Sequence, residues 1–213
     1  MSALDTITWP NVRSHYDERV RIHEELLALR KKGDARKFAN LLLGVSNAAG
    51  NYSANEHKLG PKILAKNDNA EQRVGDLAEK FLGLERAFEV PQLIRSAQLL
   101  YLKIGVGSEA SCMLNPEFCW VANTRTIWAH LVIKHADDFK KADEELTLYR
   151  NADVTSEMAY QSWARIHQEL KISMTGIAEE GARLARRAKI EPGSIKFLWA
   201  DAIANALYGN HHK

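Results

Sequence analysis

The sequence predicts an all-α fold in the form of a single-domain helical bundle. Three features of the sequence indicate helices and not sheets. The 213 residues include 28 Ala and 24 Leu but only 9 Val, and Ala and Leu favour helices whereas β-branched residues favour strands. Glycine and proline are scarce, at 12 and 5 positions. Apolar residues also recur at intervals of three and four through most of the chain. We expect one domain of about eight helices over 1–213, with 47–60 as the one place for a subdivision.

Start and stop signals divide the first half of the chain into helices. Pro10 suits the first turn of a helix, where its missing N–H is tolerated, and Gly33–Asp34 interrupts the pattern that follows. A stretch rich in Asn, Ala and Gly predicts a loop at 47–60. The expected helices are 10–32, a shorter one over 38–45, one from Gly60–Pro61 to Lys66, and one opened by the cap cluster Asn67–Asp68–Asn69 and reaching Leu82.

The second half is predicted to supply the most buried helices. Pro91 begins an apolar helix that Gly105 and Gly107 are expected to end as a C-cap and tight turn. Asn115–Pro116 is a start signal for a helix through Ala136, whose two apolar stripes are typical of a central helix. Three further helices are expected: one opened by Asp137–Asp138 and ending at Tyr149, one long helix over 155–189 closed by Pro192–Gly193, and one over 195–208 before a solvated tail with His211, His212 and Lys213.

The long helix over 155–189 carries a continuous apolar seam. Its apolar residues follow one another in steps of three and four, so they form one stripe. Such a stripe packs either on other helices of the same chain or on a partner chain. The partner-chain alternative predicts a homo-oligomer. The seam residues are Ala159, Trp163, Ile166, Leu170, Met174, Ile177, Gly181 and Leu184.

Composition excludes several classes of protein. With 46% hydrophobic and 26% charged residues, the chain is neither disordered nor collagen-like. No apolar run approaches the length of a membrane span, and the N-terminus lacks the pattern of a signal peptide. The two cysteines, Cys112 and Cys119, are too few for a disulfide framework and are expected to be buried and reduced. We therefore expect no membrane partner and a cytoplasmic or other reducing, non-secreted compartment.

Arg125 and His130 are the candidate catalytic residues. Arg125 lies on an apolar stripe of the expected central helix, where a buried guanidinium needs a partner. One interpretation is a structural ion pair, and the other is that Arg125 binds a phosphate or carboxylate while His130 carries a proton. The acids available in apolar neighbourhoods are Glu109, Glu117, Glu157 and Asp201.

The segment Arg125-Thr-Ile-Trp-Ala-His130 resembles the signature of the HEPN ribonucleases, which is Arg, a polar residue, three further residues and His. Thr126 stands where that family more often has Asn, Asp or His. Proteins of this family are all-α and often dimeric, with the motif late in a helical bundle. The resemblance implies metal-independent RNA cleavage, in which Arg125 would contact the phosphate and His130 would transfer a proton.

Positive charge gathers at two places, although 29 Lys and Arg nearly balance 27 Asp and Glu. Brought onto one face, the two groups would form a groove for phosphates, and single-stranded RNA or another nucleic acid is the expected partner. Both groups are near expected helix C-termini, where cations also suit the helix dipole, so a solvated surface is the alternative. The N-terminal basic group is Arg30, Lys31, Lys32, Arg36 and Lys37, and the C-terminal basic group is Arg183, Arg186, Arg187, Lys189 and Lys196.

Three functions follow, in this order. The first is a non-enzymatic helical binding or assembly protein that self-associates and contacts RNA or another nucleic acid through the two basic groups. The second is an HEPN-like ribonuclease that uses Arg125 and His130. The third is a small-molecule-binding bundle or enzyme with a pocket near Trp120, Trp128 and Trp163. No metal site and no cofactor are expected, because the histidines lack metal-binding spacing and no phosphate-binding glycine motif is present.

Overall fold

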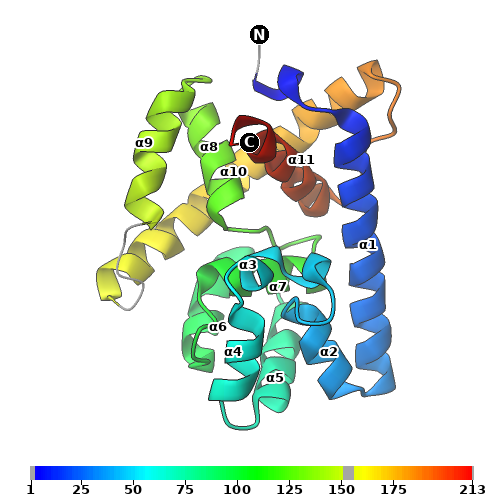
Figure 1. Ribbon diagram of the computed structural model, residues 1–213, viewed down its shortest axis with the longest axis vertical. Helices are drawn as coiled ribbons and strands as arrows, with labels where there is room; N and C mark the ends of the chain where they lie inside the picture. The colour runs from blue at the N-terminus through cyan, green and yellow to red at the C-terminus, as the bar shows by residue number, and fades with distance from the viewer. Residues whose placement is uncertain (1–2, 151–155, 213) are drawn as a thin grey trace. The chain divides into compact units, whose positions relative to one another are not determined.

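The computed structural model describes residues 3–150 and 156–212, and every regular element in these two ranges is a helix (Figure 1). This confirms the all-α fold class. The two ranges hold eleven α-helices and three short 3-10 helices, more than the expected eight or so, because the expected loop at 47–60 contains a helix and the expected helix beginning at Pro91 is divided in two. No helix in them combines the length and the apolar character that crossing a membrane requires.

The chain separates into two compact units. The first contains the described residues up to Asp17 and from Ala122 onward, and the second contains residues 18–121. One boundary therefore falls inside α1 (Trp9–Lys32). The segment 47–60, where a subdivision was expected, lies inside the second unit. The expectation of a single domain stays a prediction.

The second unit is built around α7 (Ile104–Leu114), which is buried along nearly its whole length. It contacts α3 (Tyr52–Glu56), α5 (Ala70–Leu82) and α6 (Val90–Ala97). The remaining helices of this unit are α2 (Ala35–Leu42) and α4 (Leu59–Lys66), and two 3-10 turns lie at Ala48–Gly50 and Ala87–Glu89. The prediction of a loop at 47–60 is wrong, because this segment contains α3. The side chain of Asn51 accepts a hydrogen bond from the N–H of Ala54 and caps that helix.

The expected helix from Pro91 to the glycines at 105 and 107 is also divided. It ends at Ala97, and Gln98 and Tyr101 take positive φ values in the turn that follows. Gly105 and Gly107 then lie inside α7 and do not cap the preceding helix. A Cβ at Gly107 would lie 2.4 Å from Cδ1 of Ile94, so this glycine permits α6 and α7 to pack closely.

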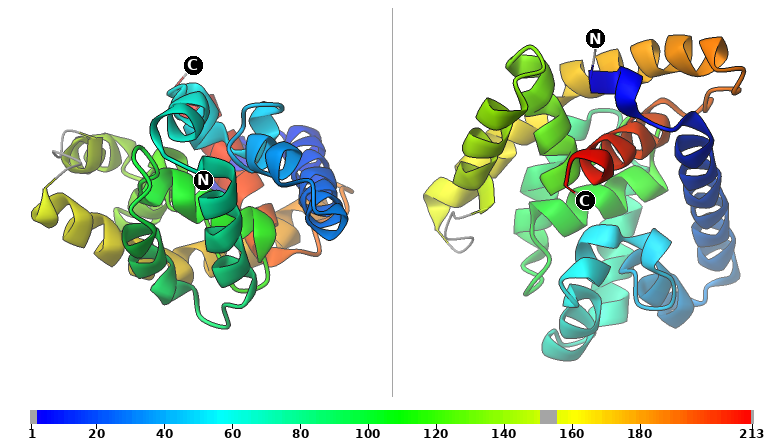
Figure 2. Two further views of the ribbon diagram at one scale, coloured as in Figure 1. Left: turned by 90° about the horizontal axis from the view of Figure 1, so that it is seen from below. Right: turned by 45° about the horizontal axis from the view of Figure 1, so that its top comes forward.

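The first unit is organised around α10 (Glu157–Arg187), which packs against α8 (Thr124–Lys134) and α11 (Lys196–His211). Helix α9 (Phe139–Arg150) lies beside α8, as Figures 1 and 2 show, and the 3-10 turn Ala3–Thr6 contacts α11. The long helix expected over 155–189 is confirmed, while Thr155 itself lies outside the described residues. Its seam is buried except for the half-buried Trp163, so this stripe packs within the chain.

Helix α8 begins eight residues later than the start expected at Pro116, at Thr124. The side chain of Asn123 accepts hydrogen bonds from the N–H groups of Arg125 and Thr126, and Oγ1 of Thr126 accepts one from the N–H of Asn123. This capping box satisfies the first N–H groups of the helix and fixes its start. At the other end of the chain, α11 continues beyond the expected Tyr208 to His211.

Candidate functional site

Arg125 and His130 both lie on α8 but bond to different helices. Nη1 of the half-buried Arg125 donates a hydrogen bond of 2.6 Å to Oδ1 of Asn205 on α11. The ring of His130 is buried, and its Nδ1 is hydrogen-bonded to Oγ of Ser173 on α10 at 2.7 Å. Burial lowers the pKa of His130 and outweighs the opposite effect of Glu169. Both side chains thus connect α8 to its neighbours in the first unit.

Glu109, one of the acids considered as a partner for Arg125, belongs to a different ion pair in the second unit. Nη1 of Arg19 lies 2.9 Å from Oε1 of Glu109, and both side chains are fully buried. Glu109 also accepts hydrogen bonds from the backbone N–H groups of Tyr52 and Ser53 at the start of α3. Burial raises the pKa of Glu109, but Arg19 and these hydrogen bonds outweigh burial and hold it below its ordinary value.

The two basic groups fall in different units. In the N-terminal basic group, the guanidinium of Arg30 donates two hydrogen bonds of 2.5 and 2.6 Å to the carboxylate of Glu79, and Lys37 forms an ion pair with Asp34. This part of the group is therefore neutralised by neighbouring acids.

The C-terminal basic group lies at the end of α10 and just beyond it. Arg183 forms an ion pair with Glu180. The other four members of the C-terminal basic group are exposed, and none of them forms an ion pair within 4 Å in residues 3–150 and 156–212. These four cations are Arg186, Arg187, Lys189 and Lys196. They concentrate positive charge on a small part of the first unit.

No protein-family model, curated protein or solved structure matches this chain.

One set of titratable groups in the first unit was not predicted from the sequence. Nε2 of His211 lies 3.1 Å from Oδ2 of Asp143, and Nε2 of His212 lies 3.4 Å from Oδ1 of the same carboxylate. We call Asp143, His211 and His212 the histidine cluster. Burial opposes the ionisation of Asp143, but hydrogen bonds from His211 and Trp128 outweigh it and keep the pKa of Asp143 below its ordinary value.

Aromatic rings hold the histidine cluster in place. The ring of His211 stacks on the rings of Trp128 and Phe139, at centroid distances of 4.9 and 4.7 Å. The ring of His212 lies 4.1 Å from that of Tyr208. Both histidines are exposed, as expected for a solvated tail, although their rings pack on aromatic neighbours, and Lys213 lies outside the described residues.

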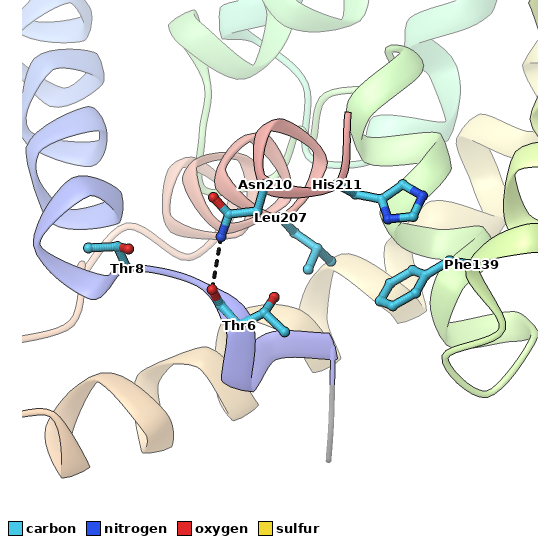
Figure 3. Close-up of a pocket in the computed structure, with 6 residues that line it drawn as sticks. All are labelled: Thr6, Thr8, Phe139, Leu207, Asn210 and His211. Atoms are coloured by element: carbon cyan, nitrogen blue, oxygen red, sulfur yellow. Dashed lines mark hydrogen bonds between the residues drawn. The ribbon is translucent and has the colours of Figure 1, made fainter. Parts of the chain in front are cut away.

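A pocket of about 430 Å³ opens beside His211 (Figure 3). Asn210 lines it, and its Nδ2 donates a hydrogen bond of 2.9 Å to the carbonyl oxygen of Thr6. Of the three tryptophans expected at a pocket, Trp128 packs on two residues of its lining, Phe139 and His211. Trp163 instead contacts Tyr149, and Trp120 belongs to the second unit. The lining consists of Thr6, Thr8, Phe139, Leu207, Asn210 and His211.

Proposed function

We propose that this protein is a non-enzymatic helical binding protein that contacts single-stranded RNA through the C-terminal basic group. The observation that carries the proposal is the exposure of Arg186, Arg187, Lys189 and Lys196, none of which forms an ion pair within 4 Å in the described ranges, although the charge of Arg187 also acts on Glu180. Cations already paired with carboxylates gain little from a phosphate, whereas these four can replace the counterions of a nucleic acid backbone. Arginine also suits phosphate because its guanidinium donates two parallel hydrogen bonds.

The N-terminal basic group supports the proposal less strongly. Arg30 and Lys37 are held by Glu79 and Asp34. Its other three members, Lys31, Lys32 and Arg36, are exposed and form no ion pair within 4 Å in the described ranges. We therefore assign this group an auxiliary contact with the same RNA and place the principal contact at the end of α10.

A binding role ranks above the HEPN-like ribonuclease because of what surrounds His130. A residue that transfers a proton to or from RNA must reach the reacting oxygen. His130 is buried and hydrogen-bonded to Ser173, and Arg125 is held by Asn205. These contacts give both side chains a structural role in joining α8 to α10 and α11.

We also propose that the protein self-associates, through apolar side chains exposed on α9 and α10. The apolar seam of α10 is buried within the chain. Large apolar side chains are instead exposed at Leu148 on α9 and at Met158 and Ile172 on α10, with exposed fractions of 70%, 79% and 82%. Such side chains are candidates for a contact with a second copy. Neither of the buried cysteines, Cys112 and Cys119, forms a disulfide, which supports a reducing compartment.

The test is binding of a fluorescently labelled oligouridine at several salt concentrations. We compare the wild type with a triple variant, R186A/R187A/K189A, and with a control that removes three exposed cations elsewhere in the first unit, K140A/R165A/K171A. Each phosphate contact on a single strand adds roughly 0.7 to the slope of log affinity against log salt. The triple variant should therefore lose up to about 2 of that slope, while the control keeps it.

Two results would overturn the RNA-binding proposal. One is the absence of binding at low salt, and the other is an equal loss of slope in the control, which would indicate only a general effect of net charge. The ribonuclease alternative is tested by incubating the protein with the same RNA in excess chelator, because that cleavage would be metal-independent. Cleavage by the wild type that disappears in the R125A and H130A variants would support catalysis. Light scattering of the same samples gives the mass of the protein with and without RNA, and a monomer in both would remove self-association from the proposal.

A further inference from the structure

The histidine cluster has a donor set that suits a metal ion. One ligand atom from each of Asp143, His211 and His212 can be chosen so that all three lie within 4.8 Å of one another. They come from two elements, α9 and the C-terminal end of α11. We propose that these three residues bind one divalent transition-metal ion of the zinc class.

The spacing of the donors supports a small ion with short bonds. A tetrahedral zinc ion with bonds of about 2.0–2.1 Å places its ligand atoms roughly 3.3 Å apart. Nε2 of His211 lies 3.1 Å from Oδ2 of Asp143, and Nε2 of His212 lies 3.4 Å from Oδ1. These two distances end on different oxygens of the Asp143 carboxylate, and one ligand atom from each residue lies within 4.8 Å of the others, so the side chains must move closer together to hold one ion.

A second observation concerns the groups that orient the ligands. Nε1 of the buried Trp128 donates a hydrogen bond of 2.6 Å to Oδ1 of Asp143. This bond fixes the carboxylate and leaves its Oδ2 facing His211. The same indole ring stacks on the ring of His211, so one buried side chain positions two of the three ligands. Hydrogen bonds of this kind to ligating carboxylates are typical of protein metal sites.

The chemistry of the three ligands selects the class of ion. Imidazole nitrogen suits Zn²⁺, Co²⁺, Ni²⁺ and Cu²⁺, whereas Mg²⁺ and Ca²⁺ prefer sites made wholly of oxygen. Three protein ligands leave the fourth position of a tetrahedral ion available for water or another small ligand. His211 also lines the pocket that contains the side chains of Thr6 and Asn210. A ligand entering the pocket would therefore approach the cluster from the side of His211.

The proposal is tested with the untagged chain of 213 residues and zinc chloride alone, by isothermal titration calorimetry. We expect one Zn²⁺ per chain, and we expect D143N and H211Q each to weaken binding by more than roughly 100-fold, beyond the 10- to 100-fold effect typical of an orienting residue. The orienting role of Trp128 predicts a loss of roughly 10-fold in W128F. Magnesium chloride at the same concentration should give no binding heat.

The chain offers a matched control in His135 and Glu145. Nε2 of His135 lies 2.8 Å from Oε2 of Glu145, so this pair has the same donor types without a second histidine. H135Q should bind zinc as the wild type does. Equal losses in H135Q and H211Q, or no zinc binding by the wild type, would overturn the proposal.

A measurement on the wild type keeps the test independent of variants that fail to fold. X-ray absorption at the zinc edge should show two imidazole nitrogens among the ligands of the bound ion. A spectrum with no imidazole ligand, or with a single one, would overturn the proposal even if zinc binds.

Discussion

Replacing Glu109 by Gln tests the account of the second unit most directly. The substitution keeps the size and shape of the side chain but removes its charge. In the wild type, Oε1 accepts hydrogen bonds from Nη1 of Arg19 and the N–H of Tyr52, and Oε2 accepts them from the N–H and Oγ of Ser53. A Gln amide presents an NH₂ group in place of one of these oxygens. That NH₂ group faces the donors of Arg19 and Tyr52 if it replaces Oε1, and it faces the N–H of Ser53 if it replaces Oε2, where Oγ of Ser53 can turn to accept.

The expected cost follows from the burial of both partners. The side chains of Arg19 and Glu109 are 0% and 1% exposed, so water cannot replace the lost carboxylate. Breaking a buried pair by removing one partner costs about 3–5 kcal/mol, because the remaining charge stays buried without its counter-charge. We expect Glu109→Gln to lower the free energy of unfolding by that amount, which is a large fraction of the stability of a domain.

Equilibrium unfolding in urea, followed by circular dichroism, measures this loss. The matched control is Glu79→Gln, which removes the same kind of carboxylate from an arginine that is exposed. The side chains of Arg30 and Glu79 are 46% and 55% exposed, so solvent screens the pair and the expected cost is about 1 kcal/mol or less. If both variants lose the same small amount, burial does not decide the strength of these pairs and the reasoning is refuted.

Two further predictions concern packing and pH. A Cβ at Gly50 would lie 1.8 Å from the backbone oxygen of Leu41, so Gly50→Ala should cost about 3 kcal/mol or more; Gly75→Ala, with nothing within 4 Å, should instead stabilise α5 by about 0.5–1 kcal/mol. Burial lowers the pKa of His167 to about 3, while an unfolded histidine titrates near about 6.5. The unfolded state therefore binds the proton first, and the free energy of unfolding should fall by about 2 kcal/mol from pH 7 to pH 5. His167→Gln should reduce that pH dependence, and an unchanged dependence would contradict the assignment.

Local signals were sufficient for the fold class and for several helices. Helix α1 begins at Trp9, beside Pro10, and ends at Lys32 before Gly33, as expected from the sequence. The long helix α10 also occupies nearly its expected range. Caps, turn residues and apolar spacing act within a few residues of one another. Such features can be read without knowledge of the tertiary structure.

Two helix boundaries predicted between residues 91 and 136 were wrong. Gly107 looked like a helix stop, but it lies inside α7 because Ile94 occupies the space of a side chain there. Pro116 looked like a helix start, while the capping box of Asn123 and Thr126 begins α8 eight residues later. That capping box was a readable signal in the sequence. The role of Gly107 was not, because it depends on the closeness of two helices.

Apolar periodicity along the sequence determined that this chain forms helices with buried faces, and the tertiary structure alone decided what each face meets. The seam of α10 could have met a partner chain but packs on α8 and α11. Partners such as Arg19 and Glu109 are 90 residues apart, and Asp143 and His211 are 68 apart. Periodicity shows which side of a helix avoids water. The partner of a buried charge, and the convergence of the three side chains of the histidine cluster, depend on which helix faces come together.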